Sequence, residues 1–237
     1  MKKVFFLLLL LPRLAFGAVA VDADSSATCT GCSTLSWSHT VGASGTLLAC
    51  SITNVEAASP TSTVTFNAVS MTAHTLLDSL TGGLLDLWYK ASPAVGTHTT
   101  AVTLTGTVDA MAGGCTSFTG ANGTPGGSIT AVGTSPSALI DGVAVTVPAN
   151  GMAFGVGLYG FAACTNEAPD TGNTERYDVC ADAGGNNAGA FAVTRTTSGQ
   201  VVWTNRPSGA SEALIVVPIY TSTPPAAAPR RMVVTVQ

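Results

Sequence analysis

Charged side chains are scarce in this sequence of 237 residues. Asp, Glu, Lys and Arg make up 9% of it, against about 25% in an average globular protein. Low charge is also found in disordered and membrane proteins, but here the apolar residues alternate with Thr, Ser and Gly, as in half-buried β-strands. After the N-terminal segment, no apolar run is long enough for a transmembrane helix. We therefore expect a folded mature protein without a membrane-spanning segment.

Basic residues are scarcer than acidic ones, with nine Lys and Arg against 13 Asp and Glu. Three of the nine, Lys2, Lys3 and Arg13, belong to the N-terminal segment; without them, six basic against 13 acidic residues give a net charge of −7. The only remaining basic pair is Arg230-Arg231. Nucleic-acid binding requires a basic patch, so we expect no nucleic-acid partner.

The N-terminal segment has the layout of a secretory signal peptide. Lys2 and Lys3 precede an apolar run from Val4 to Leu11, and Ala15-Phe16-Gly17 offers a small-residue cleavage site. This predicts a signal peptide over residues 1–17, with a second possible cut after Ala20. The apolar run is too short to span a bilayer; the alternative is a retained N-terminal anchor. We expect a secreted protein at an extracellular surface, bacterial or virion.

A convincing helical period is missing as well. Short alternating segments recur instead, separated by Gly, Pro, Asn and Asp. In one of them Thr99, Ala101 and Thr103 lie on one side, and Thr100, Val102 and Leu104 on the other. This pattern predicts an all-β protein: a single antiparallel β-sandwich, jelly-roll-like, over residues 21–222.

Some segments are predicted to lie outside the regular strands. Asp22–Ser33 and Thr165–Asn187 are expected to be loops, and Phe191–Arg195 with Gln200–Trp203 a hairpin. Residues 223–237 form a Pro/Ala linker followed by an extended, strand-like tail. That tail is either an edge strand or frayed end of this domain, or a strand offered to a neighbouring subunit.

The stretch Asp109–Thr119 predicts a strand with a thin centre. Gly113 lies on one face and Gly114 on the other. Small residues in a strand indicate close approach by another layer. We expect that layer to be Glu212–Tyr220 or Met152–Tyr159.

Six cysteines in an exported protein predict disulfides, although six allow fifteen connectivities. The first expectation is Cys164 with Cys180, which bracket a polar loop. Cys29 and Cys32 could close a small loop. Cys50 and Cys115 lie in apolar runs and either pair across the core or remain buried free thiols.

Catalytic motifs are absent. There is no G-x-S-x-G, and His39, His74 and His98 lie in or beside Thr- and Ser-rich strand segments, where a hydrogen-bonded or exposed His is ordinary. A glycosidase needs two facing carboxylates; the candidates are Asp78, Asp86, Asp109 and Asp141. Gly155–Gly160 matches G-x-G-x-x-G within an alternating run, which favours a packed strand. Cys29-x-x-Cys32 lacks the further ligands of a zinc site. We assign no catalytic residue and expect no enzyme.

Two sets of residues are candidates for binding. The acidic loop from Cys164 to Asn187 could supply oxygen ligands to a Ca²⁺ ion, although it lacks the D-x-D-x-D-G spacing. The alternative is a solvated loop that binds no ion. The aromatic set either stacks on sugar rings or packs in the core. The calcium candidates are Glu167, Asp170, Asp178 and Asp182, and the glycan candidates are Trp37, Trp88, Tyr89 and Trp203.

A series of short motifs resembles a known type of domain. The motifs are S-W-S-H-T-V-G at Ser36–Gly42, L-L-A-C-S-I at Leu47–Ile52, V-T-F-N-A-V-S-M-T at Val64–Thr72, L-W-Y at Leu87–Tyr89, T-A-V-T-L-T-G at Thr100–Gly106 and A-G-G-C-T-S-F-T-G at Ala112–Gly120. Together they resemble poorly characterised β-sandwich domains of secreted bacterial and phage or metagenomic proteins. The resemblance implies an extracellular or virion-surface, jelly-roll-like module and supplies no catalytic residues.

The leading hypothesis is therefore a non-enzymatic structural or adhesive module, self-associating or bound to other surface proteins. The alternative is a carbohydrate-binding module assisted by calcium, and a weaker third class is a secreted glycan-active enzyme. Filaments or oligomers without ligand would indicate assembly, whereas an aromatic-lined groove would indicate a lectin.

Overall fold

The computed structural model describes residues 17–55, 61–80, 83–134, 143–160, 168–201, 203–204 and 211–222. Every element in this part of the chain is a β-strand, and every strand pair is antiparallel. The prediction of an all-β, antiparallel sandwich is therefore confirmed. The tail, residues 223–237, lies outside the described residues. None of the described segments forms a helix of the length and apolarity that crossing a membrane requires.

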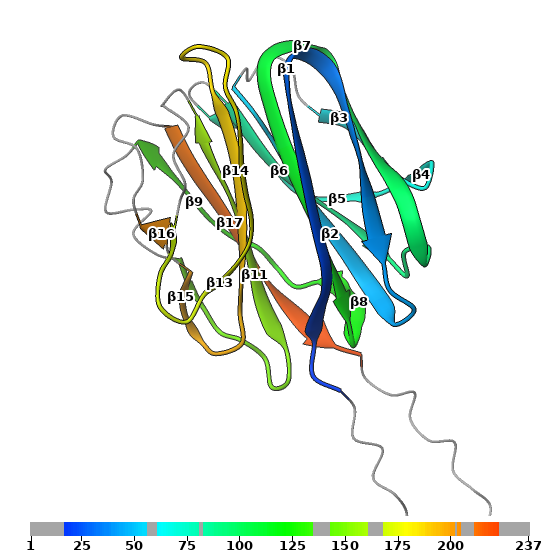
Figure 1. Ribbon diagram of the computed structural model, residues 1–237. Coiled ribbons are helices and arrows are strands. Elements are labelled where there is room, and N and C mark those ends of the chain that lie inside the picture. The colour runs from blue at the N-terminus through cyan, green and yellow to red at the C-terminus, as the bar shows by residue number, and fades with distance from the viewer. Residues whose placement is uncertain are drawn as a thin grey trace, which may run out of the picture.

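The first sheet contains seven strands in the order β4-β3-β7-β2-β6-β5, with β1 alongside β7. Figure 1 shows it as the right-hand part of the molecule. Its strands are β1 (Ala20–Val41), β2 (Gly45–Asn54), β3 (Thr61–Phe66), β4 (Val69–Ser70), β5 (Thr72–Leu80), β6 (Gly83–Ala91) and β7 (Gly96–Thr119).

The second sheet has the order β13-β14-β11-β17-β8, with β9 also paired to β17. Two small two-stranded sheets, β10 with β15 and β12 with β16, accompany it. The bounds are β8 (Ala121–Pro125), β9 (Ile129–Thr134), β10 (Val143–Val145), β11 (Met152–Gly160), β12 (Ala168–Pro169), β13 (Thr174–Ala181), β14 (Ala188–Arg195), β15 (Gly199–Val201), β16 (Trp203–Thr204) and β17 (Ser211–Thr221).

Three local predictions are wrong. The expected loop Asp22–Ser33 is part of β1, and the expected loop Thr165–Asn187 contains β13. The expected hairpin does not form, because β15 pairs with β10 and not with β14. The beginning of β1 pairs with β7, and β15 pairs with β10, so these partners are tens of residues away and local composition carried no sign of them. β13 instead pairs with the next strand, β14, within a polar segment whose composition resembles that of a loop.

The first sheet folds over itself because β1 and β7 are exceptionally long, at 22 and 24 residues. Both strands bend sharply at one end of the molecule (Figure 1). At the bend, Cys32 pairs with Val108 but Thr34 pairs with Thr103, so β7 contains extra residues there. We call the part beyond the bend the folded-over layer: Thr34–Val41 of β1, Gly96–Leu104 of β7, and β3.

This folding gives β2 two buried faces. Leu47 and Ala49 pack with the second sheet in one core, while Leu48, Cys50 and Ile52 pack with the folded-over layer in another. A strand buried on both sides is expected to be a near-continuous apolar run, as Leu47–Ile52 is. A third core covers the outer face of the second sheet beneath β10 and β15.

The thin centre of β7 accommodates an aromatic ring on each face. A Cβ atom at Gly114 would lie 2.6 Å from the ring of Tyr177 in β13, and one at Gly113 would lie 3.4 Å from the ring of Trp37 in β1. The layers that approach the glycines are therefore β13 and the folded-over layer. The expected strand β11 does contact the same stretch, through Phe118 and Phe154, whose ring centroids are 5.4 Å apart.

The first and last described residues lie at the same end of the molecule, opposite the bend (Figure 1). The Ser222 amide donates to the Gly120 carbonyl at 2.9 Å. A Cβ at Gly120 would lie 3.0 Å from the Ala18 carbonyl oxygen. Both ends of the described chain thus meet at Gly120.

Candidate functional site

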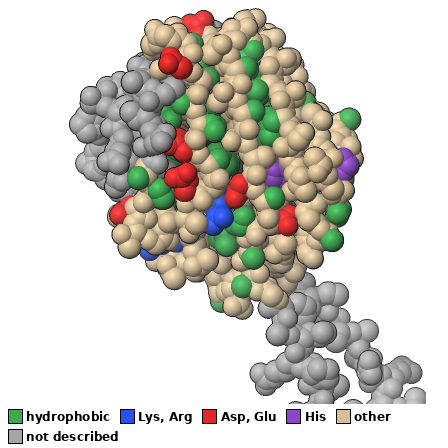
Figure 2. All heavy atoms as spheres, viewed as in Figure 1, with side chains coloured by type: hydrophobic (Ala, Val, Ile, Leu, Met, Phe, Trp, Pro, Cys, Tyr) green, Lys and Arg blue, Asp and Glu red, His purple; other side chains and the backbone are tan. Residues whose placement is uncertain are grey.

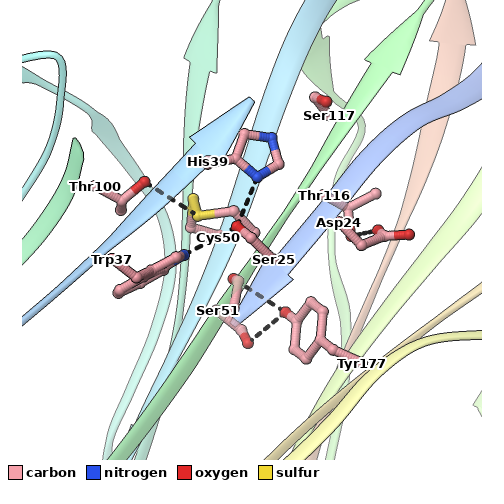
Figure 3. The surroundings of a disulfide bond; sticks show 12 residues. Asp24, Ser25, Trp37, His39, Cys50, Ser51, Thr100, Thr116, Ser117 and Tyr177 are labelled. Atoms are coloured by element: carbon pink, nitrogen blue, oxygen red, sulfur yellow. Dashed lines mark hydrogen bonds between the residues drawn. A yellow bond between two sulfur atoms is a disulfide. The ribbon is translucent and has the colours of Figure 1, made fainter. Parts of the chain in front are cut away.

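A disulfide between Cys50 and Cys115 lies at the centre of the buried polar groups (Figure 3). The two residues are direct partners on neighbouring strands β2 and β7. The bond therefore joins neighbouring strands within one sheet. The sequence-based expectation of a bond across the core between sheets, and its alternative of free thiols, are both wrong in this respect. Ser25 of β1 lies on the other side of Cys115, which puts Ser25 beside the disulfide.

Ser25 connects the two halves of β1 across the bend. The Trp37 indole Nε1 donates to Ser25 Oγ at 3.0 Å, and Ser25 Oγ lies 2.7 Å from His39 Nδ1 (Figure 3). Ser25 Oγ thus accepts from Trp37 and also shares a hydrogen bond with His39, whose direction is set by the imidazole tautomer. Burial lowers the His39 pKa from 6.5 to about 4, against the opposing effect of the Asp22 carboxylate. The ring is therefore neutral at physiological pH.

A serine beside a histidine suggests nucleophilic catalysis, but the surroundings favour a structural role. His39 is 1% exposed between two layers of the sheet, and a nucleophile needs room for a substrate carbonyl. Asp22 reinforces the same connection, since its carboxylate accepts from the Gly42 amide at 2.7 Å and from Ser117 Oγ at 2.9 Å. The first bond ties the beginning of β1 to the residue after its end, and the second ties it to β7.

A second polar network joins the two sheets. Tyr177 Oη donates to the Gly114 carbonyl at 3.1 Å and lies 2.8 Å from Ser51 Oγ, which must then donate to it. Burial raises the pKa of the Tyr177 phenol. Nearby, Asp24 accepts from Thr116 Oγ1 at 2.7 Å and lies 3.7 Å from Arg176 Nη1. Burial raises the pKa of Asp24, and the contacts with Thr116 and Arg176 oppose the rise.

The outer surface of the folded-over layer is a regular array of hydroxyl side chains. Thr34, Thr103 and Thr63 form one cross-strand row, and Ser36 and Thr65 flank Ala101 in the next. Further rows pair Ser38 with Thr99 and Thr40 with Thr97. We call this surface the hydroxyl face: Thr34, Ser36, Ser38, Thr40, Thr63, Thr65, Thr97, Thr99 and Thr103. Most of these side chains are exposed, and none is charged.

A shallow hollow of about 340 Å³ opens at one end of the hydroxyl face. Its lining combines Ser38, Thr97 and Thr99 of that face with His98 and the β3–β4 turn, Asn67-Ala68. The backbone amide of Asn67 donates to the Thr99 carbonyl at 3.0 Å, which fixes the turn against β7. Sequence reasoning found the alternation of Thr99 and Thr103, but it had no means of placing Asn67 beside them.

Two of the predicted glycan-stacking aromatics are buried in the core. Trp37 is 9% exposed and Trp88 is 8% exposed, both within the core beneath the folded-over layer. Tyr89 is half-buried, with its ring centroid 6.0 Å from that of His74. The side chain of Trp203 lies outside the described residues. Trp37 and Trp88 therefore pack as core residues, the second of the two roles that the sequence left open.

The predicted calcium ligands that the structure describes each have a local hydrogen-bond partner. Asp170 is in a turn closed by the Asn173 amide, Asp178 accepts from Tyr159 Oη at 3.2 Å, and Asp182 accepts from the Gly184 amide at 3.0 Å. Glu167 lies outside the described residues. Among the side chains that are described, no three of His, Cys, Asp or Glu gather as a metal site would require.

The remaining predicted groups are dispersed. Cys29 and Cys32 form a disulfide at the bend, and Cys180 is disulfide-bonded; Cys164, its predicted partner, lies outside the described residues. Asp86 is fully buried, and Asp109 accepts from Asn186 Nδ2 at 2.6 Å. Asp141 and the side chain of Asp78 lie outside the described residues.

Comparisons with known proteins found no matching family model, no matching curated protein and no matching solved structure.

Proposed function

We propose that this chain is a non-enzymatic module of an extracellular surface, bacterial or virion, with a structural or adhesive role. The hydroxyl face carries the proposal. It is the outer surface of a folded-over layer, which is anchored by a disulfide-bonded strand pair and by the Ser25 hydrogen bonds. An uncharged array of exposed hydroxyl groups can exchange hydrogen bonds with the polar groups of another surface.

The placement of the chain ends supports the same role. Both ends of the described chain meet at Gly120, so a tether or a neighbouring module attached there leaves the hydroxyl face accessible. In Figure 2 the charged side chains lie mainly over the middle and left of the view, away from most of the folded-over layer. Adhesion through this layer therefore depends on hydrogen bonds more than on ion pairs.

The test is adhesion of the purified secreted chain to bacterial cell envelopes and to itself. We expect the wild type to sediment with envelopes or to form oligomers on a sizing column. The Ser36→Glu/Thr99→Glu variant should lose envelope adhesion, because it places charges within the array. Thr107→Glu, an exposed position of β7 outside the array, is the control. A wild-type chain that neither adheres nor associates would refute the proposal.

Self-assembly through the C-terminal strand is a separate part of this proposal. Met232–Gln237 lies outside the described residues, but its apolar and β-branched composition favours addition to a sheet edge of a second copy. Deletion of residues 224–237 should convert oligomers to monomers on a sizing column. If the deletion leaves assembly unchanged, the tail has no part in it.

The alternative function is carbohydrate binding, and the polar hollow beside the β3–β4 turn is the observation that favours it. Its lining offers hydroxyl, amide and imidazole groups, which match sugar hydroxyls. A glycan array probed with the secreted chain, with and without Ca²⁺, tests this function and its dependence on calcium. Binding to no glycan in either condition would eliminate it.

A further inference from the structure

The hollow beside the β3–β4 turn is a fixed surface feature. Asn67 and Ala68 both have positive φ, 52° and 58°, which is the conformation of a tight two-residue hairpin turn. Beyond the bond between the Asn67 amide and Thr99, the Met71 amide donates to the Val64 carbonyl at 2.8 Å. The turn is thus held on both sides and keeps Asn67 at the rim of the hollow.

His98 is held in place as well. Its Nε2 lies 3.0 Å from the Val95 carbonyl, and its ring meets Phe66 edge-on with centroids 5.6 Å apart. A carbonyl oxygen only accepts, so Nε2 carries a proton, and in the neutral ring Nδ1 is an acceptor. The imidazole therefore contributes a directed acceptor on a ring fixed by packing.

The lining offers matched donors and acceptors without charge. Thr97 Oγ1 is 2.8 Å from Thr40 Oγ1 and is engaged in that bond. Ser38 and Thr99 contribute hydroxyl groups, and the side-chain amide of Asn67 can both donate and accept. None of the six lining residues is Asp, Glu, Lys or Arg. An anionic ligand would lose hydration there without gaining a counter-charge, and the acidic balance of the chain would repel it further.

We propose that this hollow binds one unit of a neutral polysaccharide, whose neighbouring units extend over the hydroxyl face. The inference rests on the carbohydrate-binding function proposed above and names its site and ligand class. The volume of about 340 Å³ lies at the lower end of the range for small-molecule sites, about 300–1,000 Å³. The rows Ser36–Ala101–Thr65 and Thr34–Thr103–Thr63 continue from the hollow along the strands, each two residues or about 6.6 Å beyond the last, with about 4.8 Å between neighbouring strands within a row.

The test measures binding of the full secreted chain to immobilised neutral glucan, mannan, galactan and chitin, with anionic alginate for comparison. Asn67→Gly removes the side-chain amide and keeps the backbone turn, since glycine adopts positive φ freely. Asn150→Gly is the matched control, because Asn150 also has positive φ, 56°, and lies in a different turn. Ser38→Glu is a second variant, which adds a charge at an exposed position.

We expect the wild type to bind at least one neutral polysaccharide and to bind alginate more weakly. Asn67→Gly should raise the dissociation constant about tenfold, as expected for lost hydrogen bonds, and Ser38→Glu should abolish binding, while Asn150→Gly stays within about twofold. Wild-type binding that both Asn67→Gly and Ser38→Glu preserve, or a preference for alginate, overturns the site and leaves carbohydrate binding intact. A wild type that binds no glycan refutes the underlying function itself.

Discussion

Two adjacent glycines of β7 receive aromatic rings from opposite sides. Gly113 faces Trp37 of the folded-over layer, and Gly114 faces Tyr177 of β13. Neighbouring residues of a strand point to opposite faces, so one dipeptide makes room for two separate layers. The hydrogen bond from Tyr177 to the Gly114 carbonyl adds a polar contact at the same point.

Gly114→Ala is expected to lower the free energy of unfolding by about 1–3 kcal/mol, the usual cost of overpacking a filled core. The added methyl group would lie 2.6 Å from a ring that is itself held by two hydrogen bonds. Urea unfolding measures the change. Gly127→Ala, where no atom lies within 4 Å of the added Cβ, should stay within about 0.5 kcal/mol. Equal stability of the two variants would show that Tyr177 does not pack as described.

His39 makes stability depend on pH. Its folded pKa of about 4 lies below the ordinary 6.5, so between these values the unfolded chain binds a proton that the folded chain does not. The free energy of unfolding should therefore fall as the pH drops from about 6.5 to 4, by about 3 kcal/mol at about 1.4 kcal/mol per pH unit. Urea unfolding across this range measures the slope.

His39→Asn is the control for that slope. Its amide oxygen can still accept from Ser25 but does not titrate, so the variant should show a flatter profile above pH 4. Asp24 acts in the opposite direction, because its raised pKa favours the folded state at acid pH; it is the same in both proteins. Parallel profiles for the wild type and the variant would contradict the neutral, buried state of His39.

On the scale of elements, the bend of β1 depends on Ser25. Its hydroxyl is bonded to two residues beyond the bend, 12 and 14 positions later. Ser25→Ala would leave the Trp37 and His39 nitrogens without these partners, at a cost of about 1–3 kcal/mol.

Hydrogen exchange should then accelerate in Thr34–Val41 more than in β2. Ser36→Ala, at an exposed position of the same strand, should leave the exchange pattern unchanged. Uniform acceleration across both sheets would instead indicate a global loss of stability.

The two disulfides seen in full should contribute unequally to stability. Cys50–Cys115 spans 65 positions and Cys29–Cys32 spans three. In the chain-entropy account, the longer loop gives about 4 kcal/mol and the shorter about 2 kcal/mol. The C50A/C115A and C29A/C32A double variants, compared by urea unfolding, test the order. A larger loss in C29A/C32A would contradict the entropic account.

On the scale of the whole molecule, the two predicted positions of signal cleavage would have different effects on the fold. Val19 is 4% exposed in the main core, and its amide donates to the Asn150 carbonyl at 2.8 Å. A cut after Gly17 retains Val19, whereas a cut after Ala20 removes it together with the first residue of β1.

We therefore expect N-terminal sequencing of the secreted protein to begin at Ala18. A chain that begins at Val21 should be less stable by about 2 kcal/mol, the value of one buried Val and one hydrogen bond. A secreted protein that begins at Val21 with undiminished stability would show that Val19 is dispensable.

The sequence by itself determined the kind of elements and part of the hydroxyl face. Alternation is a local property, so Thr99, Ala101 and Thr103 were predicted to share a face from their spacing. The near-continuous apolar run Leu47–Ile52 indicated a buried strand, because the apolar character of a segment is also a local property. The thin centre at Gly113 and Gly114 likewise indicated close approach by another layer, because small side chains leave room that must be filled.

Only the tertiary structure decided which partners fill those positions. Alternation assigns Trp37 to one face of its strand but does not tell whether that face is buried. The ring is buried because β1 bends and brings it over Gly113. Ser38 and Asn67 come to Thr99 from β1 and from the β3–β4 turn, through pairings across tens of residues. Such pairings depend on the register of whole strands, and the register is set when all layers close on their cores together.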